Sequence, residues 1–413
     1  MAFDLLIENI KGLVQVRDST PTFLSGSAMG ELPILSNAYL AVKDGLIAEY
    51  GGQEDAPAEA IEKVDASGKF VLPSFVDSHT HLVFAATREE EFVLKTKGAS
   101  YEEIAAAGGG ILNSAKKLQA VSEQELFDRS MPRAIEIIQT GTGAVEIKSG
   151  YGLTVKDEIK MLRVAKKIGL ETGLTVKTTF LGAHAVPKEM TKPNYLKLVL
   201  EEMIPAIAEE KLADYIDVFC EEGFFSREET VSIIEQGKKF GMKPRIHANQ
   251  LSRSGGVQVG VATKALSVDH LENIGDEEIE LLKNTQVMPT ALPFAAFFLG
   301  LPFPPIRKML NAGLPIAVAS DYNPGSSPSG SMPLMFSLAC IKMKMTPEEA
   351  FNAVTVNTAG CLELLGSHGS ITKGKKANLI ITKPAPSFAY LPYRLGYNWI
   401  DEIFLNGKRI SYT

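Results

Sequence analysis

Alternating apolar and polar positions predict short strands near both ends of the chain. The alternating runs are residues 4–9, 38–43, 46–50, 377–382 and 399–405. An Asp-Gly pair at 44–45 and an Asn-Gly pair at 406–407 follow two of these runs, and such pairs are strong signals for the tight turn of a β-hairpin. We therefore expect both chain ends to share one small β-sandwich domain, residues 1–66 and 369–413.

The central part of the chain alternates apolar, β-branched runs with stretches of helical periodicity. The apolar runs are residues 70–77, 143–148, 175–183, 215–221, 244–248, 265–270, 286–292 and 314–321. Apolar residues recur at helical spacing over 155–168, 194–210, 227–240 and 276–283. This order is typical of β-α units around a parallel sheet, and eight strands favour a (β/α)8 barrel over residues 67–368. An open doubly wound sheet is the alternative, since no local pattern marks the closure of a barrel.

The composition, with 45% hydrophobic and 22% charged residues, is that of an ordinary folded protein. The net charge is −7 and no long basic run occurs, which argues against a nucleic-acid partner. The first residues lack the basic and apolar regions of a secretory signal, so we expect a cytoplasmic protein. The longest uncharged run, 291–306, contains four prolines, and we expect an apolar loop there and no membrane partner. A helix expected over 347–354 offers a surface for a homodimer.

Histidine is rare in this chain and is concentrated where a barrel enzyme carries its chemistry. Five of the six histidines fall at or just beyond the carboxyl end of an expected strand: His79, His81, His184, His247 and His270. The loops after the strands of a barrel converge at that end, and catalytic residues gather there. A single histidine in such a place is more often a polar residue bonded to its neighbours, so the argument depends on the clustering.

His79 and His81 are separated by one residue at a strand end, so their side chains point the same way and can chelate one metal ion. His247, on the fifth expected strand, offers a third imidazole, and Asp321, at the end of the eighth, offers a carboxylate oxygen. Asp321 alone is explained equally well as the cap of the turn that follows it. Together, three imidazoles and one carboxylate suit zinc or iron, and the sequence does not distinguish the two.

This set resembles the amidohydrolase superfamily, whose members carry a His-x-His pair on the first barrel strand, histidines on the fifth and sixth, and an aspartate on the eighth. The matching residues are, in that order, His79, His81, His247, His270 and Asp321. Binuclear members also use a carbamylated lysine from the fourth strand, where residues 218–223 of this chain include no lysine. The resemblance therefore implies one metal ion. We expect Glu221 in that stretch to be a solvated loop acid rather than a further ligand.

Three longer motifs, residues 146–152, 180–187 and 321–326, resemble one family within that superfamily, the imidazolonepropionases. The resemblance implies hydrolysis of 4-imidazolone-5-propanoate to N-formimino-L-glutamate, a step of histidine degradation, with a single zinc or iron ion. It also implies a set of residues that bind this carboxylate-bearing small molecule: Arg88, Tyr151, His184, Gln250, Asn323, Gly325 and Ser326.

The residue types suit this reaction. Metal-activated water supplies a hydroxide near neutral pH, and Asp321 is placed to take the water proton and return it to the leaving nitrogen. His270 is expected either to share that proton transfer or to polarise the carbonyl. Arg88 can bind the substrate carboxylate through two parallel hydrogen bonds from its guanidinium group. Taken alone, Arg88 is explained equally well by a surface ion pair with the glutamates that follow it.

Gln250 separates two classes of reaction. Related ring deaminases place a glutamate three residues after the histidine of the fifth strand, because protonating a ring nitrogen needs an ionisable acid. Gln250 can donate and accept hydrogen bonds but cannot shuttle a proton. Ring opening is therefore favoured, with another cyclic amidohydrolase or a ring deaminase as the alternative. A non-catalytic ligand-binding barrel is the alternative from a different class.

Overall fold

Eight parallel strands form a barrel in the computed structural model, which describes residues 2–19, 22–98 and 109–411. The barrel strands are β6 (Phe75–Asp77), β7 (Thr142–Lys148), β8 (Thr175–Ala183), β9 (Tyr215–Cys220), β10 (Lys243–Ala248), β11 (Ser267–His270), β12 (Met288–Ala291) and β13 (Ala317–Val318). They pair in chain order. Two backbone hydrogen bonds lie beyond the ends of β6 and β13. The amide of Asp321 donates to the carbonyl of His79, and the amide of His81 donates to the carbonyl of Tyr322, both at 2.9 Å. These bonds close the barrel beside the histidine pair, and the expected barrel is confirmed.

The stretch expected to be the first barrel strand is divided between two sheets. Phe70–Pro73 (β5) pairs with the small sheet described below, whereas Phe75–Asp77 (β6) begins the barrel. Both pieces are fully buried, so one continuous apolar pattern covers them. Ser74, at the division, donates its amide to the carbonyl of Asn378 in the small domain at 2.8 Å. The chain thus passes directly from the small domain into the strand that precedes the histidine pair.

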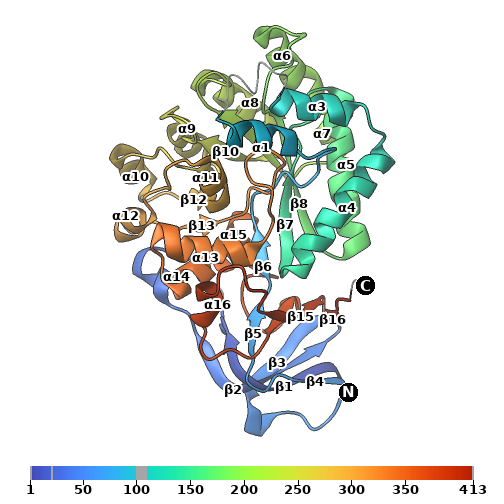
Figure 1. Cartoon of the computed structure of the whole chain (residues 1–413), viewed down its shortest axis with the longest axis vertical. Coiled ribbons are helices and arrows are strands. Elements are labelled where there is room, and N and C mark those ends of the chain that lie inside the picture. The colour runs from blue at the N-terminus through green and yellow to red at the C-terminus, as the bar shows by residue number, and fades with distance from the viewer. Residues whose placement is uncertain (1, 20–21, 99–108, 412–413) are drawn as a thin grey trace.

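Helices cover the outside and the mouth of the barrel (Figure 1). They are α1 (Glu89–Thr96), α3 (Ile111–Gln119), α4 (Glu123–Gln139), α5 (Val155–Thr172), α6 (Lys192–Leu198), α7 (Ile204–Glu209), α8 (Arg227–Lys239), α9 (Gly256–Thr263), α10 (Asp276–Leu282), α11 (Pro293–Leu299), α12 (Ile306–Asn311), α13 (Met332–Met343), α14 (Pro347–Ala353), α15 (Val356–Cys361) and α16 (Tyr390–Tyr393). A π-helical turn, Val199–Met203, joins α6 to α7. The four helices expected from periodicity are therefore confirmed, with the one over 194–210 built from these three pieces.

The expected loop over 291–306 is wrong in part, because Pro293–Leu299 forms α11. Proline has no amide hydrogen and suits the first turn of a helix, where that hydrogen has no partner, so Pro293 starts the helix rather than preventing it. Gly300 ends it in the left-handed conformation, with φ of 71°. Within the described part of the chain, the helices are all too short or too polar to cross a bilayer.

Both ends of the chain meet in one mixed eight-stranded sheet beside the barrel (Figure 1). Its strands are β1 (Phe3–Val14), β2 (Ile34–Lys43), β3 (Leu46–Gly52), β4 (Ala60–Asp65), β5, β14 (Leu379–Thr382), β15 (Ile400–Leu405) and β16 (Lys408–Arg409). The expected turns at 44–45 and 406–407 join β2 to β3 and β15 to β16. This agrees with the small domain predicted from both termini, while its limits at 66 and 369 stay a prediction.

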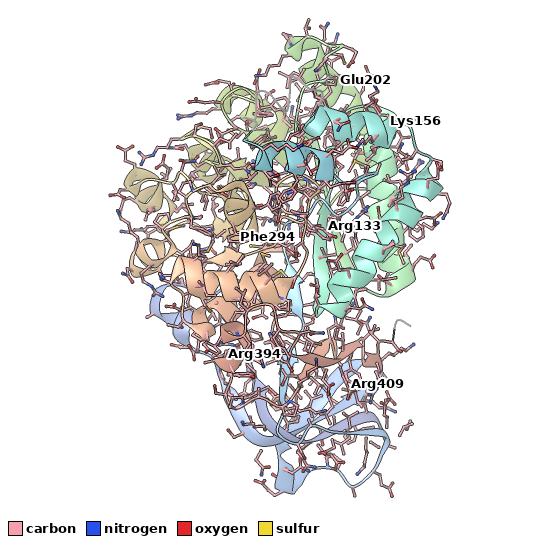
Figure 2. All side chains as sticks on the ribbon, viewed as in Figure 1. Arg133, Lys156, Glu202, Phe294, Arg394 and Arg409 are labelled. Atoms are coloured by element: carbon pink, nitrogen blue, oxygen red, sulfur yellow. The ribbon has the colours of Figure 1, made fainter. Side chains whose placement is uncertain are left out.

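Side chains fill the space between the barrel and the small sheet (Figure 2). Arg409, labelled there on the small domain, pairs with Glu62 at 2.8 Å and ties β16 to β4. The helix expected over 347–354 is α14, and its Phe351 and Ala353 are completely buried within the chain. Much of that helix therefore packs internally, and the homodimer stays a prediction.

Candidate metal centre and substrate pocket

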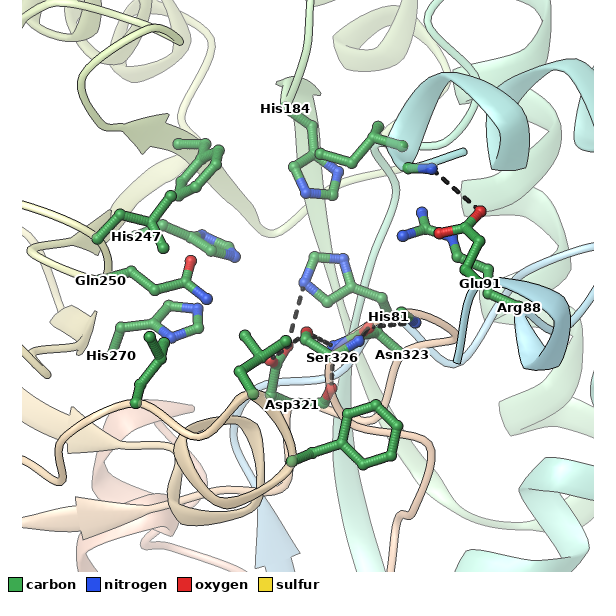
Figure 3. Close-up of a pocket in the computed structure, with 18 of the residues that line it drawn as sticks. His81, Arg88, Glu91, His184, His247, Gln250, His270, Asp321, Asn323 and Ser326 are labelled. Atoms are coloured by element: carbon green, nitrogen blue, oxygen red, sulfur yellow. Dashed lines mark hydrogen bonds and ion pairs between the residues drawn. The ribbon is translucent and has the colours of Figure 1, made fainter. Parts of the chain in front are cut away.

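Five histidines meet at the carboxyl ends of the barrel strands, and all are buried. Figure 3 shows four of them, His81, His184, His247 and His270. The centroids of the His79 and His247 rings lie 4.5 Å apart, and those of His247 and His270 lie 5.3 Å apart. His81 lies between this group and His184, whose ring stacks on it at 5.2 Å and 20°. Strands far apart in the sequence thus deliver one imidazole cluster, as the barrel topology predicts.

Two nitrogen atoms of this cluster lie close to the carboxylate of Asp321. Nε2 of His79 lies 3.6 Å and Nε2 of His81 3.5 Å from the same Asp321 oxygen. Ligand atoms around a tetrahedral ion with bonds of about 2.1 Å are roughly 3.4 Å apart, so this spacing fits a shared metal. His79 belongs to two groups whose ligand atoms lie within 4.8 Å of one another, one with His81 and Asp321 and one with His247 and His270.

The environment of His79 provides a further test of the metal site. Its Nε2 atom is buried and has no hydrogen-bond partner among the described residues, a costly arrangement unless a ligand is bound there. Its Nδ1 atom hydrogen-bonds to Asp269 at 2.7 Å, which leaves the lone pair of Nε2 free to bind a cation. The residues present therefore fit a divalent metal ion.

Two carboxylates orient histidines of the cluster, and neither of them was predicted from the sequence. Asp269 holds His79, and Oδ2 of Asp217 lies 2.9 Å from Nδ1 of His247. Arg245 pairs with Asp269 at 3.2 Å. Each of these charges lies within an apolar barrel strand and is fully buried. That pattern was visible in the sequence, because a charge within a buried strand requires a partner.

The pKa values of the cluster reflect burial and nearby charge. Burial lowers the pKa values of His79 and His81 well below the usual value, which keeps both imidazoles neutral and able to bind a metal. Burial raises the pKa of Asp321 to about 7. Burial opposes the charge on His270, but the carboxylate of Glu272, 3.3 Å from its Nδ1 atom, raises the pKa of this histidine. The Asp321 carboxyl can therefore gain and lose a proton near neutral pH, and Glu272 favours the charged form of His270.

Arg88 presents an unpaired guanidinium edge to the cavity. Its Nε donates to Oγ of Ser114 at 2.8 Å, whereas its Nη2 is buried and has no hydrogen-bond partner among the described residues. Gly325 leaves room for it, since a Cβ atom at that position would lie 2.2 Å from Nη1 of Arg88. Arg88 is therefore oriented by Ser114, and the alternative of a surface ion pair with the following glutamates does not describe it.

The loop after β13 is held by Asn323. Its Oδ1 atom accepts from the amides of Gly325 and Ser326, both at 2.8 Å, and its Nδ2 donates to Oγ of Ser326 at 2.8 Å. The carbonyl of Asp321 accepts from the same Nδ2 at 2.7 Å. One asparagine thus fixes the loop relative to Asp321.

Tyr151 and His184 line the cavity next to each other. Nδ1 of His184 lies 3.0 Å from the carbonyl of Gly150 and donates to it, which leaves Nε2 as an acceptor. Gly150 adopts φ of 111°, and a Cβ there would lie 3.0 Å from Nδ1 of His184, so glycine is required for this approach. The Tyr151 ring, 2% exposed, lies 5.4 Å from that of His184.

One cavity of about 490 Å³ connects these groups. The predicted site residues that line it are His81, Arg88, Tyr151, His184, His247, Gln250, His270, Asp321, Asn323, Gly325 and Ser326. Ile111, Phe219, Phe298 and Leu299 add an apolar part to its wall. His79 lies beneath the cavity and reaches it through its contact with Asp321.

Glu221 and His368 lie apart from this cavity. Glu221 is only 2% exposed and accepts the amide of Leu251 at 2.9 Å, so the expectation of a solvated loop acid is wrong. The structure uses its carboxylate to tie the ends of β9 and β10 together. His368 contacts Ser367 and Asn378 near the small sheet.

Comparison with known proteins places this geometry in a family. The model of the amidohydrolase family matches residues 70–410. The imidazolonepropionase of Christiangramia forsetii is 55% identical over 98% of this chain and all of its own length. That of Thermoanaerobacter pseudethanolicus is 39% identical over 98% of this chain and 97% of its own.

Solved structures with low sequence identity share the fold. Guanine deaminase of E. coli superposes with a TM-score of 0.76 at 13% identity and covers all of both chains. A zinc-bound adenosine deaminase of Xanthomonas campestris superposes with a TM-score of 0.71 at 16% identity, over 99% of this chain and 93% of its own. At this level of identity the likeness shows the barrel and its companion domain.

Proposed function

The chain belongs to the amidohydrolase family and, within it, to the imidazolonepropionases, and from this premise we propose that it hydrolyses 4-imidazolone-5-propanoate to N-formimino-L-glutamate. The observation that supports this most directly is the placement of the Arg88 guanidinium and the imidazole cluster around one cavity. The pocket would have the Arg88 guanidinium at one end and the proposed metal centre at the other. This arrangement suits a small cyclic amide that bears a carboxylate.

We propose His79, His81, His247 and Asp321 as the ligands of one divalent or trivalent metal ion, zinc or iron. When bound, such an ion lowers the pKa of a water molecule and supplies hydroxide near neutral pH. Asp321 takes the proton of the attacking water and delivers it to the ring nitrogen as the carbon–nitrogen bond breaks. His270, with its pKa raised by Glu272, donates a hydrogen bond to the developing negative charge on the carbonyl oxygen.

The other side chains of the cavity orient the substrate. We propose that Arg88 binds the propionate, with the loop of Asn323, Gly325 and Ser326 beside it. Tyr151, His184 and Gln250 then contact the ring. Because Nδ1 of His184 donates to the carbonyl of Gly150, its Nε2 accepts a hydrogen bond from a ring N–H.

Product analysis tests the proposal. Purified protein loaded with zinc or ferrous iron is given 4-imidazolone-5-propanoate, and the product is identified by mass spectrometry. We expect one water to be added and N-formimino-L-glutamate to form, with His247→Ala losing bound metal and turnover together. Absence of ring opening by the metal-loaded protein, with ammonia released from a purine or pyrimidine instead, would identify a ring deaminase.

We also propose, from the sequence, that the protein acts in the cytoplasm without a nucleic-acid or membrane partner and that it forms a homodimer. Sedimentation of the purified protein tests the last point. A particle of twice the chain mass supports the dimer, and a single-chain particle contradicts it.

A further inference from the structure

Lys148, at the end of β7, lies among the charges beneath the metal centre and has no part in the proposed chemistry. It is 1% exposed. Its Nζ atom lies 2.8 Å from Glu146 and 2.9 Å from Asp217. A buried lysine costs free energy by desolvation, and a buried ion pair is weak evidence for stability, so its place beside the site calls for another explanation.

Lys148 pairs with two carboxylates, and each of them contacts a different part of the proposed metal-ligand set. Asp217 lies 2.9 Å from Nδ1 of His247. Glu146 accepts the backbone amide of Thr80 through its side chain at 3.3 Å and the Thr80 hydroxyl through its carbonyl at 2.7 Å. Thr80 is the residue between His79 and His81. The amide of Lys148 itself donates to the carbonyl of Thr80 at 2.9 Å.

We propose that Lys148 is a positioning residue of the metal centre, which fixes His247 relative to the His79 and His81 pair through Asp217 and Glu146. Without the ammonium group, the two buried carboxylates would repel each other, and Asp217 would no longer be held against His247. This inference rests on the proposed metal-dependent function. Carboxylates that orient a ligating histidine affect metal affinity by roughly 10- to 100-fold.

Zinc affinity, measured by competition with a chromophoric chelator on metal-free protein, tests the role of Lys148 without reference to turnover. We expect Lys148→Met to weaken zinc binding by roughly 10-fold or more. Lys160→Met is the matched control. Lys160 is also a buried lysine, 6% exposed, and pairs with Asp157 at 2.7 Å on α5, away from the site. This control should lower the melting temperature and leave zinc affinity unchanged.

Asp217→Asn provides a second, independent variant if Lys148→Met does not fold. It keeps the shape of the side chain but removes the charge that joins Lys148 to His247, and it should weaken zinc binding to a similar degree. Where the double variant folds, adding Lys148→Met to Asp217→Asn should cause a smaller loss than Lys148→Met causes alone, because the connection through Asp217 is already removed and only that through Glu146 remains. Wild-type zinc affinity in folded Lys148→Met or in Asp217→Asn would overturn the inference. Failure of the wild-type protein to bind zinc or iron would instead contradict the proposed function.

Discussion

The carboxylate of Asp321 is proposed to combine two roles, metal ligand and proton carrier, in one side chain. It lies within 3.6 Å of Nε2 of both His79 and His81, and burial raises its pKa to about 7. Its Oδ2 atom also lies 3.5 Å from the hydroxyl of Ser326 on the substrate-facing loop. One residue therefore connects the proposed metal ligands with the residues proposed to bind the substrate.

Replacement of Asp321 by asparagine separates these two roles, because the amide retains an oxygen but cannot carry a proton. We expect Asp321→Asn to reduce kcat by roughly 100-fold or more, with a smaller change in KM. Steady-state kinetics at matched metal occupancy measure this. Full turnover by the variant would exclude Asp321 as the proton carrier.

Replacement of Arg88 should affect substrate binding rather than the chemical step. A charge-assisted hydrogen bond contributes about 1.5–3 kcal/mol, so Arg88→Met should raise KM by roughly 10- to 100-fold and change kcat little. Arg88→Lys keeps the charge without the planar fork and should give an intermediate KM. An unchanged KM in Arg88→Met would place the substrate carboxylate elsewhere.

The histidines and Asp321 could be predicted because each is a rare or reactive residue at an expected strand end. Asp217, Asp269 and Lys148 could not be assigned from spacing alone. Their partners come from other strands, and only the closed barrel shows which charge meets which. His79 and Asp269, for example, are 190 positions apart and 2.7 Å from each other.

At the scale of elements, the short loop after β13 joins the metal centre to the Arg88 pocket. Asn323 fixes it through its side chain, and Gly325 leaves the space that the guanidinium occupies. The sequence predicted the eight barrel units, because an apolar run marks each strand. It did not predict the division of 70–77 between two sheets, since both pieces are equally apolar and buried.

Gly325→Ala tests the fit between this loop and Arg88. A methyl group at this position would lie 2.2 Å from Nη1 of Arg88, so the guanidinium must move. We expect KM to rise several-fold with little change in melting temperature. Gly366→Ala is the control, because a Cβ there meets no atom within 4 Å. Equal KM values for the two variants and the wild type would contradict the proposed position of the substrate carboxylate.

At the scale of the whole molecule, the small sheet is joined to the barrel at the foot of the first two barrel strands. Asn378 accepts the amide of Ser74 through its carbonyl, and its side chain donates to the carbonyl of Gly143 at 3.4 Å. His368 contacts the Asn378 side chain at 3.3 Å. Burial lowers the pKa of His368 to about 3. A neutral histidine is thus enclosed at the junction of the two domains.

This histidine makes stability depend on pH in a known direction. An unfolded histidine, with a pKa near 6.5, binds a proton as the pH falls, whereas His368 in the folded chain does not, so acid favours unfolding. Between pH 7 and pH 5 the wild type should lose about 2 kcal/mol more than His368→Gln in free energy of unfolding. Urea unfolding at the two pH values measures the difference. Parallel losses in both proteins would show that His368 is accessible to protons in the folded state.

One metal ion, held by His79, His81, His247 and Asp321, is proposed to serve the hydrolysis. Stepwise addition of zinc or ferrous iron to metal-free protein, with turnover of 4-imidazolone-5-propanoate recorded at each step, tests it most directly. The structure predicts no turnover without metal, a linear rise as metal is added, and a plateau at one ion per chain. Turnover by fully metal-free protein, or a plateau reached only at two ions per chain, would contradict it.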